Sequence, residues 1–174
     1  MGLTVLEVMI VLAAIGIMVL IAVPGSSLFL DKHRMRVSSD SIITGLELAR
    51  SEASARGIAV VLCPSSNGHT CRSDGDWNYG WLVFSDGNGN GTVQDIELIQ
   101  AFGAPSQNIR IKADGAVHKR AAFTATGLIA NNNAHSGQFQ ICLQDSTNPA
   151  TLVKVDADGW VRKIPSRDGA CVSG

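Results

Sequence analysis

The feature that most constrains this chain is the nearly unbroken apolar run from Leu3 to Val23. It contains no Lys or Arg, and Glu7 is its only ionisable residue. At about 1.5 Å per residue, a helix of this length covers roughly 30 Å, the thickness of the hydrocarbon core of a bilayer. We therefore predict a helix held in a membrane. A carboxylate in hydrocarbon is costly unless a partner neutralises it, so Glu7 is a candidate functional residue.

A plain anchor or a signal peptide is one interpretation of this run. A signal peptide has a basic start, a shorter apolar core and a small-residue cleavage site, whereas Pro24-Gly25 follows the run here. The segment Gly2-Leu3-Thr4-Val5-Leu6-Glu7 instead resembles the processing site of type IV pilins and type II secretion pseudopilins. The resemblance implies that a peptidase cuts after Gly2 and that Leu3 becomes a methylated N-terminus. It also implies that Glu7 pairs with the terminal amine of a neighbouring subunit during assembly.

The start of the chain departs from that family in one respect. The family's leader carries Lys or Arg before the glycine, whereas only Met1 precedes Gly2 here. We interpret residues 1–2 as the remnant of a leader that was truncated or whose start was misassigned. The cations that follow the run, with Asp31 as the only nearby acid, are Lys32, Arg34 and Arg36. Taken alone, the positive-inside rule would put the C-terminal side in the cytoplasm; the cysteines favour the opposite orientation.

Four cysteines follow the apolar run: Cys63, Cys71, Cys142 and Cys171. An even number in a domain tethered outside a membrane predicts disulfides, with three possible pairings. We favour Cys63–Cys71 as a local loop and Cys142–Cys171 as a staple of the C-terminus. A metal site that includes His69 is the alternative, although no C-x-x-C spacing supports it.

Beyond Pro24-Gly25, which is expected to kink or loosen the helix, the helical pattern resumes. One helical stripe is formed by Met35, Ile42, Leu46, Ala49 and Ala53. Arg36, Asp40, Glu47 and Arg50 lie opposite, and Gly57 is a good C-cap. From Ile58 the period changes, and turn residues separate eight predicted strands. Their ranges are 58–63, 81–84, 97–102, 109–113, 121–125, 138–143, 151–155 and 161–164.

These patterns predict an α+β fold in which one long N-terminal helix precedes an antiparallel, β-rich globular head. The helix would cover residues 3–57, with a transmembrane part at 3–24 and an amphipathic part at 25–57. The head would cover residues 58–174.

The resemblance narrows in the segment that joins helix and head. The motifs are Leu48-Ala49-Arg50-Ser51-Glu52-Ala53, Arg56-Gly57, Val60-x-x-Cys63 and Asp76-Trp77-x-x-Gly80-Trp81-x-Val83-Phe84-x-Asp86. Together they resemble the FimT/FimU minor pilins and the GspH minor pseudopilins, from the processing site to about Glu97. The family implies two small sheets in the head and a helix packed in a pilus core against other minor and major pilins.

The same resemblance implies a location and a function. The chain would be a single-pass protein of the inner membrane with a periplasmic head, extracted later into a pilus fibre on the cell surface. It would act at or near the tip and help to start the fibre. A GspH-type minor pseudopilin of a type II secretion system is the alternative.

Asp86-Gly87-Asn88-Gly89-Asn90-Gly91 and Glu97 fit the spacing of a calcium-binding loop. Asp86, Asn88, Asn90 and Glu97 would supply oxygen ligands. A strand precedes the loop and no helix flanks it, so a Gly/Asn-rich turn between two strands is the favoured interpretation. Apart from this calcium alternative, no cofactor is expected.

Some FimT proteins bind DNA through a C-terminal G-R-x-R motif, of which Gly159 and Arg162 match the first and last positions. Arg162, Lys163 and Arg167 could contact the phosphates of double-stranded DNA while Trp160 stacks on a base. The favoured interpretation is instead that Trp160 fills the core beside Val161 and Ile164 while the basic residues are solvated. The cluster His118-Lys119-Arg120 is expected to be an exposed hairpin turn, with a place in a binding surface as the alternative.

The overall charge attracts neither nucleic acid nor an acidic surface, because the net charge is −1 and charged residues make up 17% of the chain. Either partner would need a local patch of charge. We find no nucleophile elbow, no H-E-x-x-H and no phosphate-binding loop. The sequence therefore predicts a protein that is not an enzyme, with no catalytic residues and no small-molecule substrate.

Overall fold

The computed structural model describes residues 2, 4–22, 26–130, 136–144 and 150–165. Three residues to which the sequence assigns roles, Leu3, Arg167 and Cys171, lie outside these ranges. The chain divides into two compact units, residues 1–33 and residues 34–174. The predicted division at residue 57 separates helix from head along the sequence. The boundary between the compact units lies before residue 57 in the sequence, because the helix from Met35 onward is buried against the head.

The first unit contains helix α1, Val5–Ala22. Its first turn is closed by a reciprocal pair of contacts, in which Thr4 N–H donates to Glu7 Oε2 and Glu7 N–H donates to Thr4 Oγ1, each at 3.4 Å. This is a capping box, which satisfies two of the backbone donors at the start of a helix. Within the part of the chain that the structure describes, no helix has both the length and the apolar character needed to cross a membrane.

Helix α2, Ser26–Arg56, carries the predicted apolar stripe. Ile42, Leu46, Ala49 and Ala53 are fully buried and Met35 is nearly so, which confirms the prediction. The helix ends where Gly57 adopts a φ of 68°, and the Gly57 N–H still donates to Ala53 O at 3.0 Å. Left-handed backbone at this position is favourable for glycine and costly for other residues.

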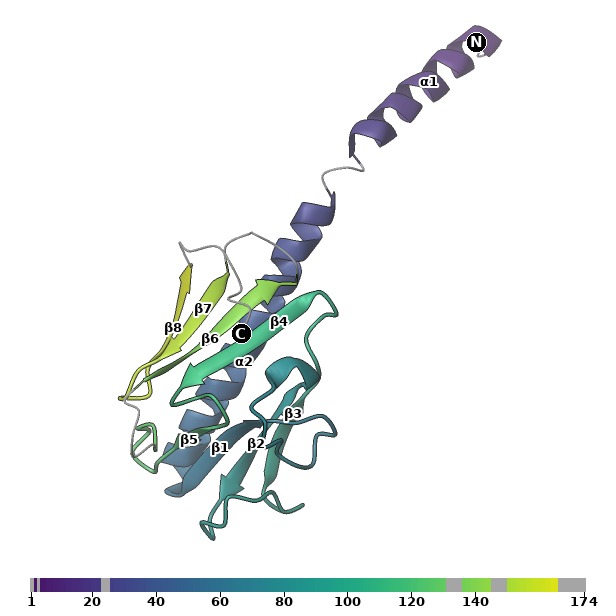
Figure 1. Cartoon of the computed structure of the whole chain (residues 1–174). Helices are drawn as coiled ribbons and strands as arrows, with labels where there is room; N and C mark the ends of the chain where they lie inside the picture. Colours follow the sequence, from purple (N-terminus) through teal and green to yellow (C-terminus); the bar gives the residue numbers. More distant parts are fainter. Residues whose placement is uncertain (1, 3, 23–25, 131–135, 145–149, 166–174) are drawn as a thin grey trace. The chain divides into compact units, whose positions relative to one another are not determined.

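Two antiparallel sheets of four strands each accompany α2 in the second unit (Figure 1). Sheet A has the order β3-β2-β1-β5, formed by Leu98–Phe102, Trp81–Asp86, Ala59–Pro64 and Ala121–Phe123. Sheet B has the order β4-β6-β7-β8, formed by Ile109–Gly115, Gly137–Leu143, Thr151–Val155 and Val161–Pro165. All eight predicted strands are present, so the α+β fold with a helix and two small sheets is confirmed.

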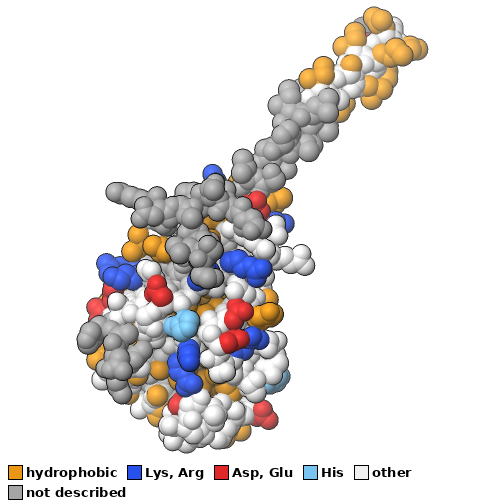
Figure 2. Space-filling view, viewed as in Figure 1, with side chains coloured by type: hydrophobic (Ala, Val, Ile, Leu, Met, Phe, Trp, Pro, Cys, Tyr) orange, Lys and Arg blue, Asp and Glu red, His pale blue; other side chains and the backbone are white. Residues whose placement is uncertain are grey.

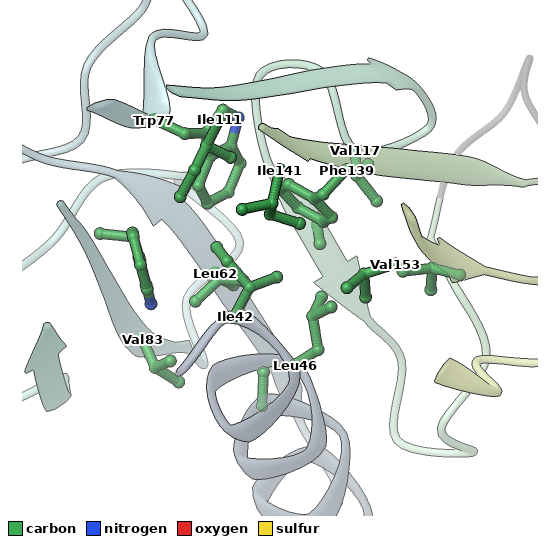
Figure 3. Close-up of a cluster of buried hydrophobic side chains, with 14 of the residues drawn as sticks. Ile42, Leu46, Leu62, Trp77, Val83, Ile111, Val117, Phe139, Ile141 and Val153 are labelled. Carbon is green, nitrogen blue, oxygen red and sulfur yellow. The ribbon is translucent and has the colours of Figure 1, made fainter. Parts of the chain in front are cut away.

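One hydrophobic core joins the helix and both sheets (Figure 3). Ile42 and Leu46 enter it from α2, Leu62 and Val83 from sheet A, and Phe139 from sheet B. Burying large aliphatic and aromatic side chains contributes about 1.5–3 kcal/mol each. The head therefore depends on α2 for one wall of its core.

The two central strands of sheet A, β1 and β2, are buried on both faces. Alternate residues of β1 point to opposite sides, so Leu62 enters the main core while Val61 and Cys63 belong to a second apolar cluster with Leu82 and Phe84. This explains the continuous apolar runs of β1 and β2. Cys63 forms a disulfide with Cys71, one of the pairings that the sequence favoured. A metal site at these two cysteines with His69 is therefore wrong, because neither sulfur is a free thiolate.

The connection from β1 to β2, two strands of sheet A, packs against sheet B and so links the two sheets. It includes the short 3-10 helix η1, Trp77–Tyr79. The ring of Trp77 packs edge-on against Phe139, with centroids 4.9 Å apart, and its Nε1–H donates to His118 O at 2.9 Å. Asn78 Oδ1 accepts from Ile111 N–H at 2.8 Å. The connection between two strands of sheet A thus contacts two strands of sheet B and the turn that follows β4.

Candidate functional site

The predicted processing and assembly residues lie at the start of the first unit. Gly2 is exposed, and Glu7 lies in the first turn of α1, where its carboxylate accepts from Thr4 N–H. A helix N-terminus favours a negative charge, so this position stabilises the carboxylate within a single chain. The predicted pairing of Glu7 with a terminal amine requires a second subunit.

Apart from Arg167, which lies outside the described residues, the predicted DNA-binding residues belong to the tight turn between β7 and β8 and to β8 itself. Gly159 has a φ of 77°, and a Cβ atom added to it would lie 2.1 Å from Gly127 O. Only glycine allows this approach, which brings two turns together beside α2. The glycine of the predicted motif is thus explained by backbone packing.

Trp160 follows this glycine and is 60% exposed. The interpretation that it fills the core beside Val161 and Ile164 is therefore wrong, because in the turn its side chain points outward. Its ring instead lies under the guanidinium of Arg50, with Cζ 4.8 Å from the ring centroid. Arg50 Nη2–H also donates to Asp158 O at 3.3 Å.

Arg50 is the member of this cluster that the sequence analysis missed. Its position on α2 predicted only an exposed cation, and Asp158 lies 108 residues further along the chain. No local pattern links residues that far apart. Only the packing of the β7–β8 turn on α2 brings Trp160 under the guanidinium.

Arg162 and Lys163 are not brought together. Neighbouring residues of a strand point to opposite faces of the sheet. Arg162 pairs with Asp156, which Lys154 also contacts at 3.4 Å, whereas Lys163 Nζ reaches Asp40 Oδ1 on α2 at 2.7 Å. The structure therefore does not bring the two cations together on one surface that could bind phosphates.

The pairing of Asp156 also affects its protonation. Desolvation acts to raise the pKa of its carboxyl, but the hydrogen bond and charge of Arg162, together with Lys154, outweigh it and hold the pKa below its usual value. The positive charge of Arg162 is correspondingly offset at neutral pH. On the face that Figure 2 displays, Lys and Arg side chains are interspersed with acidic ones and do not form one broad basic surface.

Charged residues on β8 have a second physical explanation. β8 is an edge strand of sheet B, with β7 as its neighbour. Edge strands present unpaired backbone groups, and charged side chains on them oppose unwanted pairing with other strands. Arg162 and Lys163 meet this requirement whether or not they bind a ligand.

The predicted calcium ligands lie at the end of β2 and in the loop that joins it to β3, and each of their side-chain oxygens accepts a hydrogen bond from within this segment. Gly91 N–H donates to both oxygens of Asp86, at 3.2 and 3.1 Å. Asn88 Nδ2–H donates to Glu97 Oε1 at 3.1 Å, and Gln94 N–H donates to Glu97 Oε2 at 3.2 Å. The remaining two acceptors are the amide oxygens of Asn88 and Asn90, which accept from Asn90 N–H and Thr92 N–H. These oxygens hold the loop as a turn, which supports the favoured interpretation.

The basic cluster His118-Lys119-Arg120 lies on the surface, as expected, but it is not a hairpin. It connects β4 of sheet B to β5 of sheet A. The hairpin expectation failed because a hairpin joins neighbouring strands of one sheet, and the sequence does not reveal which strands are neighbours.

Comparison with known proteins gives two results. The profile of the family described as type II transport protein GspH matches residues 38–159, well over half of the chain. A comparison with curated protein sequences returned no significant match.

Solved structures show the same fold. The type IV minor pilin FimU of Pseudomonas aeruginosa matches with 18% identity and a TM-score of 0.61, over 82% of this chain and 97% of FimU. A second crystal form of FimU gives a TM-score of 0.57 at the same identity, over 78% of this chain and 97% of that one. The minor pseudopilin EpsH from the type 2 secretion system of Vibrio cholerae matches with 10% identity and a TM-score of 0.55, over 76% of this chain and 97% of EpsH.

Proposed function

Since the chain belongs to the GspH family of pilins and pseudopilins, we propose that it is a minor pilin that helps to assemble a type IV pilus. The observation that carries the proposal is the combination of a GspH-type head with an apolar N-terminal run whose one acid, Glu7, lies in the first turn of a helix. A buried anion at a fixed depth in a helix bundle can be offset by a terminal amine of another copy. Glu7 would thereby set the axial register of the subunit, at or near the tip of the fibre.

The proposal includes a route to the cell surface. Residues 3–24 would hold the chain in the inner membrane until assembly, with the head in the periplasm. The Cys63–Cys71 disulfide supports this orientation, because disulfides persist in oxidising compartments and are rare in the cytosol. Cleavage after Gly2 and methylation of Leu3 would precede assembly, and mass spectrometry of the protein from its host would detect both. An N-terminus that keeps residues 1–2 and lacks the methyl group would contradict this route.

The register role of Glu7 is tested by Glu7→Val in the host. We expect the variant to accumulate in the membrane and to be nearly absent from sheared surface fibres, measured by immunoblot of both fractions. The matched control is Asp95→Val, which removes an exposed acid from the β2–β3 loop and should leave incorporation unchanged. Normal incorporation of Glu7→Val would overturn the role.

The alternative assembly is a type II secretion system, which uses subunits of the same fold, as EpsH shows. The G-W-x-V-F run and the paired cysteines favour the pilus. Deletion of the gene separates the two. We expect loss of surface fibres with normal export of secreted proteins, whereas the reverse outcome would assign the chain to secretion.

A second candidate function is DNA binding by the head, favoured by the exposure of Trp160. Stacking of a base on an aromatic ring contributes about 1–3 kcal/mol. We expect Trp160→Ala to weaken binding of a labelled oligonucleotide at least about fivefold in fluorescence anisotropy. Tyr79→Ala is the matched control, because Tyr79 is 54% exposed and likewise carries an arginine, Arg72, over its ring. Equal losses of oligonucleotide affinity in the two variants would show that Trp160 does not belong to a DNA-binding site.

A further inference from the structure

The turn after β4, which we call the basic turn (residues 115–120), borders a cavity of about 380 Å³. Cavities that hold small ligands have volumes from about 300 Å³ upward. Among the residues that the structure describes, three lining side chains can carry positive charge and none is acidic; the lining consists of Gly115, Ala116, His118, Lys119, Arg120 and Ala130. Such a lining favours an anion.

The backbone of the basic turn is fixed from two sides. His118 O accepts from the buried Trp77 Nε1–H at 2.9 Å, and Ala116 N–H donates to Ser136 O at 3.1 Å. Val117, between them, is fully buried in the main core. A binding residue on a fixed backbone loses less entropy when it orders around a ligand. The backbone of the basic turn therefore holds its side chains in place before a ligand binds.

The side chains of the basic turn differ from the cations of β8 in their pairing. Within the described ranges, Lys119 makes no hydrogen bond or ion pair, and Arg120 makes one long contact, from Nη1 to Gly91 O at 3.5 Å. Arg162 and Lys163, by contrast, are each paired with an aspartate. Of these four cations, the two that lie at the cavity are thus the ones available to a ligand.

The histidine of the turn has a defined tautomer. His118 Nδ1 lies 2.9 Å from Ala113 O, and a carbonyl oxygen can only accept, so Nδ1 carries a proton. This contact fixes the orientation of the ring of His118, which is one of the lining residues of the cavity.

We propose that this cavity binds a phosphate group, either as free phosphate or as a phosphodiester of nucleic acid. The guanidinium of Arg120 offers several donors in one plane and the ammonium of Lys119 a mobile point charge, the combination that phosphate oxygens favour. The site goes beyond the proposed assembly role, which does not use these residues. It also locates phosphate binding away from Arg162 and Lys163.

The test uses the full chain in a non-ionic detergent and compares two double substitutions that change the net charge equally. Lys119→Ala with Arg120→Ala removes the cations of the basic turn, and Arg162→Ala with Lys163→Ala removes the paired cations of β8. Binding of inorganic phosphate is measured by calorimetry, and binding of a labelled duplex oligonucleotide by anisotropy over a range of salt concentrations. Thermal melting followed by circular dichroism confirms that both variants are folded.

We expect the 119/120 variant to lose phosphate binding and to bind the duplex at least tenfold more weakly. Its slope of log affinity against log salt should fall by about 0.9 for each phosphate that the variant no longer neutralises. The 162/163 variant should stay within twofold of the wild type. If inorganic phosphate binds and the duplex does not, the proposed site is confirmed and its ligand is free phosphate. Equal losses in both variants, or no binding of either ligand, would overturn the site, and neither result would bear on incorporation of Glu7→Val.

Discussion

At the residue scale, the approach of Gly159 to Gly127 O makes a prediction about stability. An alanine at position 159 would combine left-handed backbone with a Cβ atom 2.1 Å from a carbonyl oxygen. Gly89 is the matched control, because its φ is 70° and a Cβ there would meet nothing within 4 Å. We expect Gly89→Ala to cost about 1–2 kcal/mol. Gly159→Ala should cost at least about 3 kcal/mol, since the turn must also move. Equal melting temperatures of the two variants would contradict the packing of the turns.

The pairing of Asp156 predicts how stability changes with pH. A carboxyl whose pKa is lowered by folding stabilises the protein above its unfolded pKa, near 3.9, and loses that contribution as the pH falls through the folded value. Asp156→Asn should therefore be less stable than wild type at pH 7, and the difference should shrink below about pH 4. Urea unfolding across this pH range measures the difference in free energy of unfolding between wild type and Asp156→Asn. The exposed Asp95→Asn is the control. A difference that does not change with pH would exclude the ion pair as its cause.

How far the sequence predicts individual residues depends on how local their contacts are. The glycine C-cap at Gly57 and the local disulfide Cys63–Cys71 could be anticipated, because each depends on neighbours within a few residues. The exposure of Trp160 and the pairing of Lys163 with Asp40 could not, since they depend on which turn and strand reach α2.

At the scale of elements, the helix and all eight strands follow from the period of the apolar residues. The division of the strands between two sheets does not follow, because β4 and β5 are consecutive in sequence and belong to different sheets. The alternation of apolar residues determines which face of a strand is buried, but it does not determine which strands pair with it. The basic turn was consequently expected to be a hairpin, and its cavity had no counterpart in the sequence analysis.

The loop between β2 and β3 carries the prediction about calcium. Its carboxylate and amide oxygens already accept hydrogen bonds from the loop, so an ion would have to replace contacts with the N–H groups of Gly91 and Gln94. We expect millimolar calcium to produce no calorimetric heat and no change in melting temperature. A stabilisation that Glu97→Gln abolishes would instead establish the calcium interpretation.

At the scale of the whole head, the shared core predicts cooperative unfolding. Trp77, in the connection between β1 and β2, contacts Phe139 of sheet B, and Trp81 of β2 is buried against Phe102 of sheet A. Trp77 therefore reports on the contact between the two sheets and Trp81 on sheet A. In a Trp160→Phe background, which removes the exposed indole, urea transitions followed by fluorescence and by far-ultraviolet circular dichroism should coincide. Two separate transitions would show that the sheets unfold independently.

The ion pair between Asp40 and Lys163 joins residues 123 positions apart, and the hydrogen bond from Arg50 to the backbone carbonyl of Asp158 joins residues 108 positions apart. A ribosome makes α2 long before it makes β7 and β8. The apolar stripe of this helix therefore stays without its final cover through most of the synthesis of the head. A nascent chain paused before residue 151 would expose that stripe to chaperones. The helix would be released from them only after the hairpin of β7 and β8 has been synthesised.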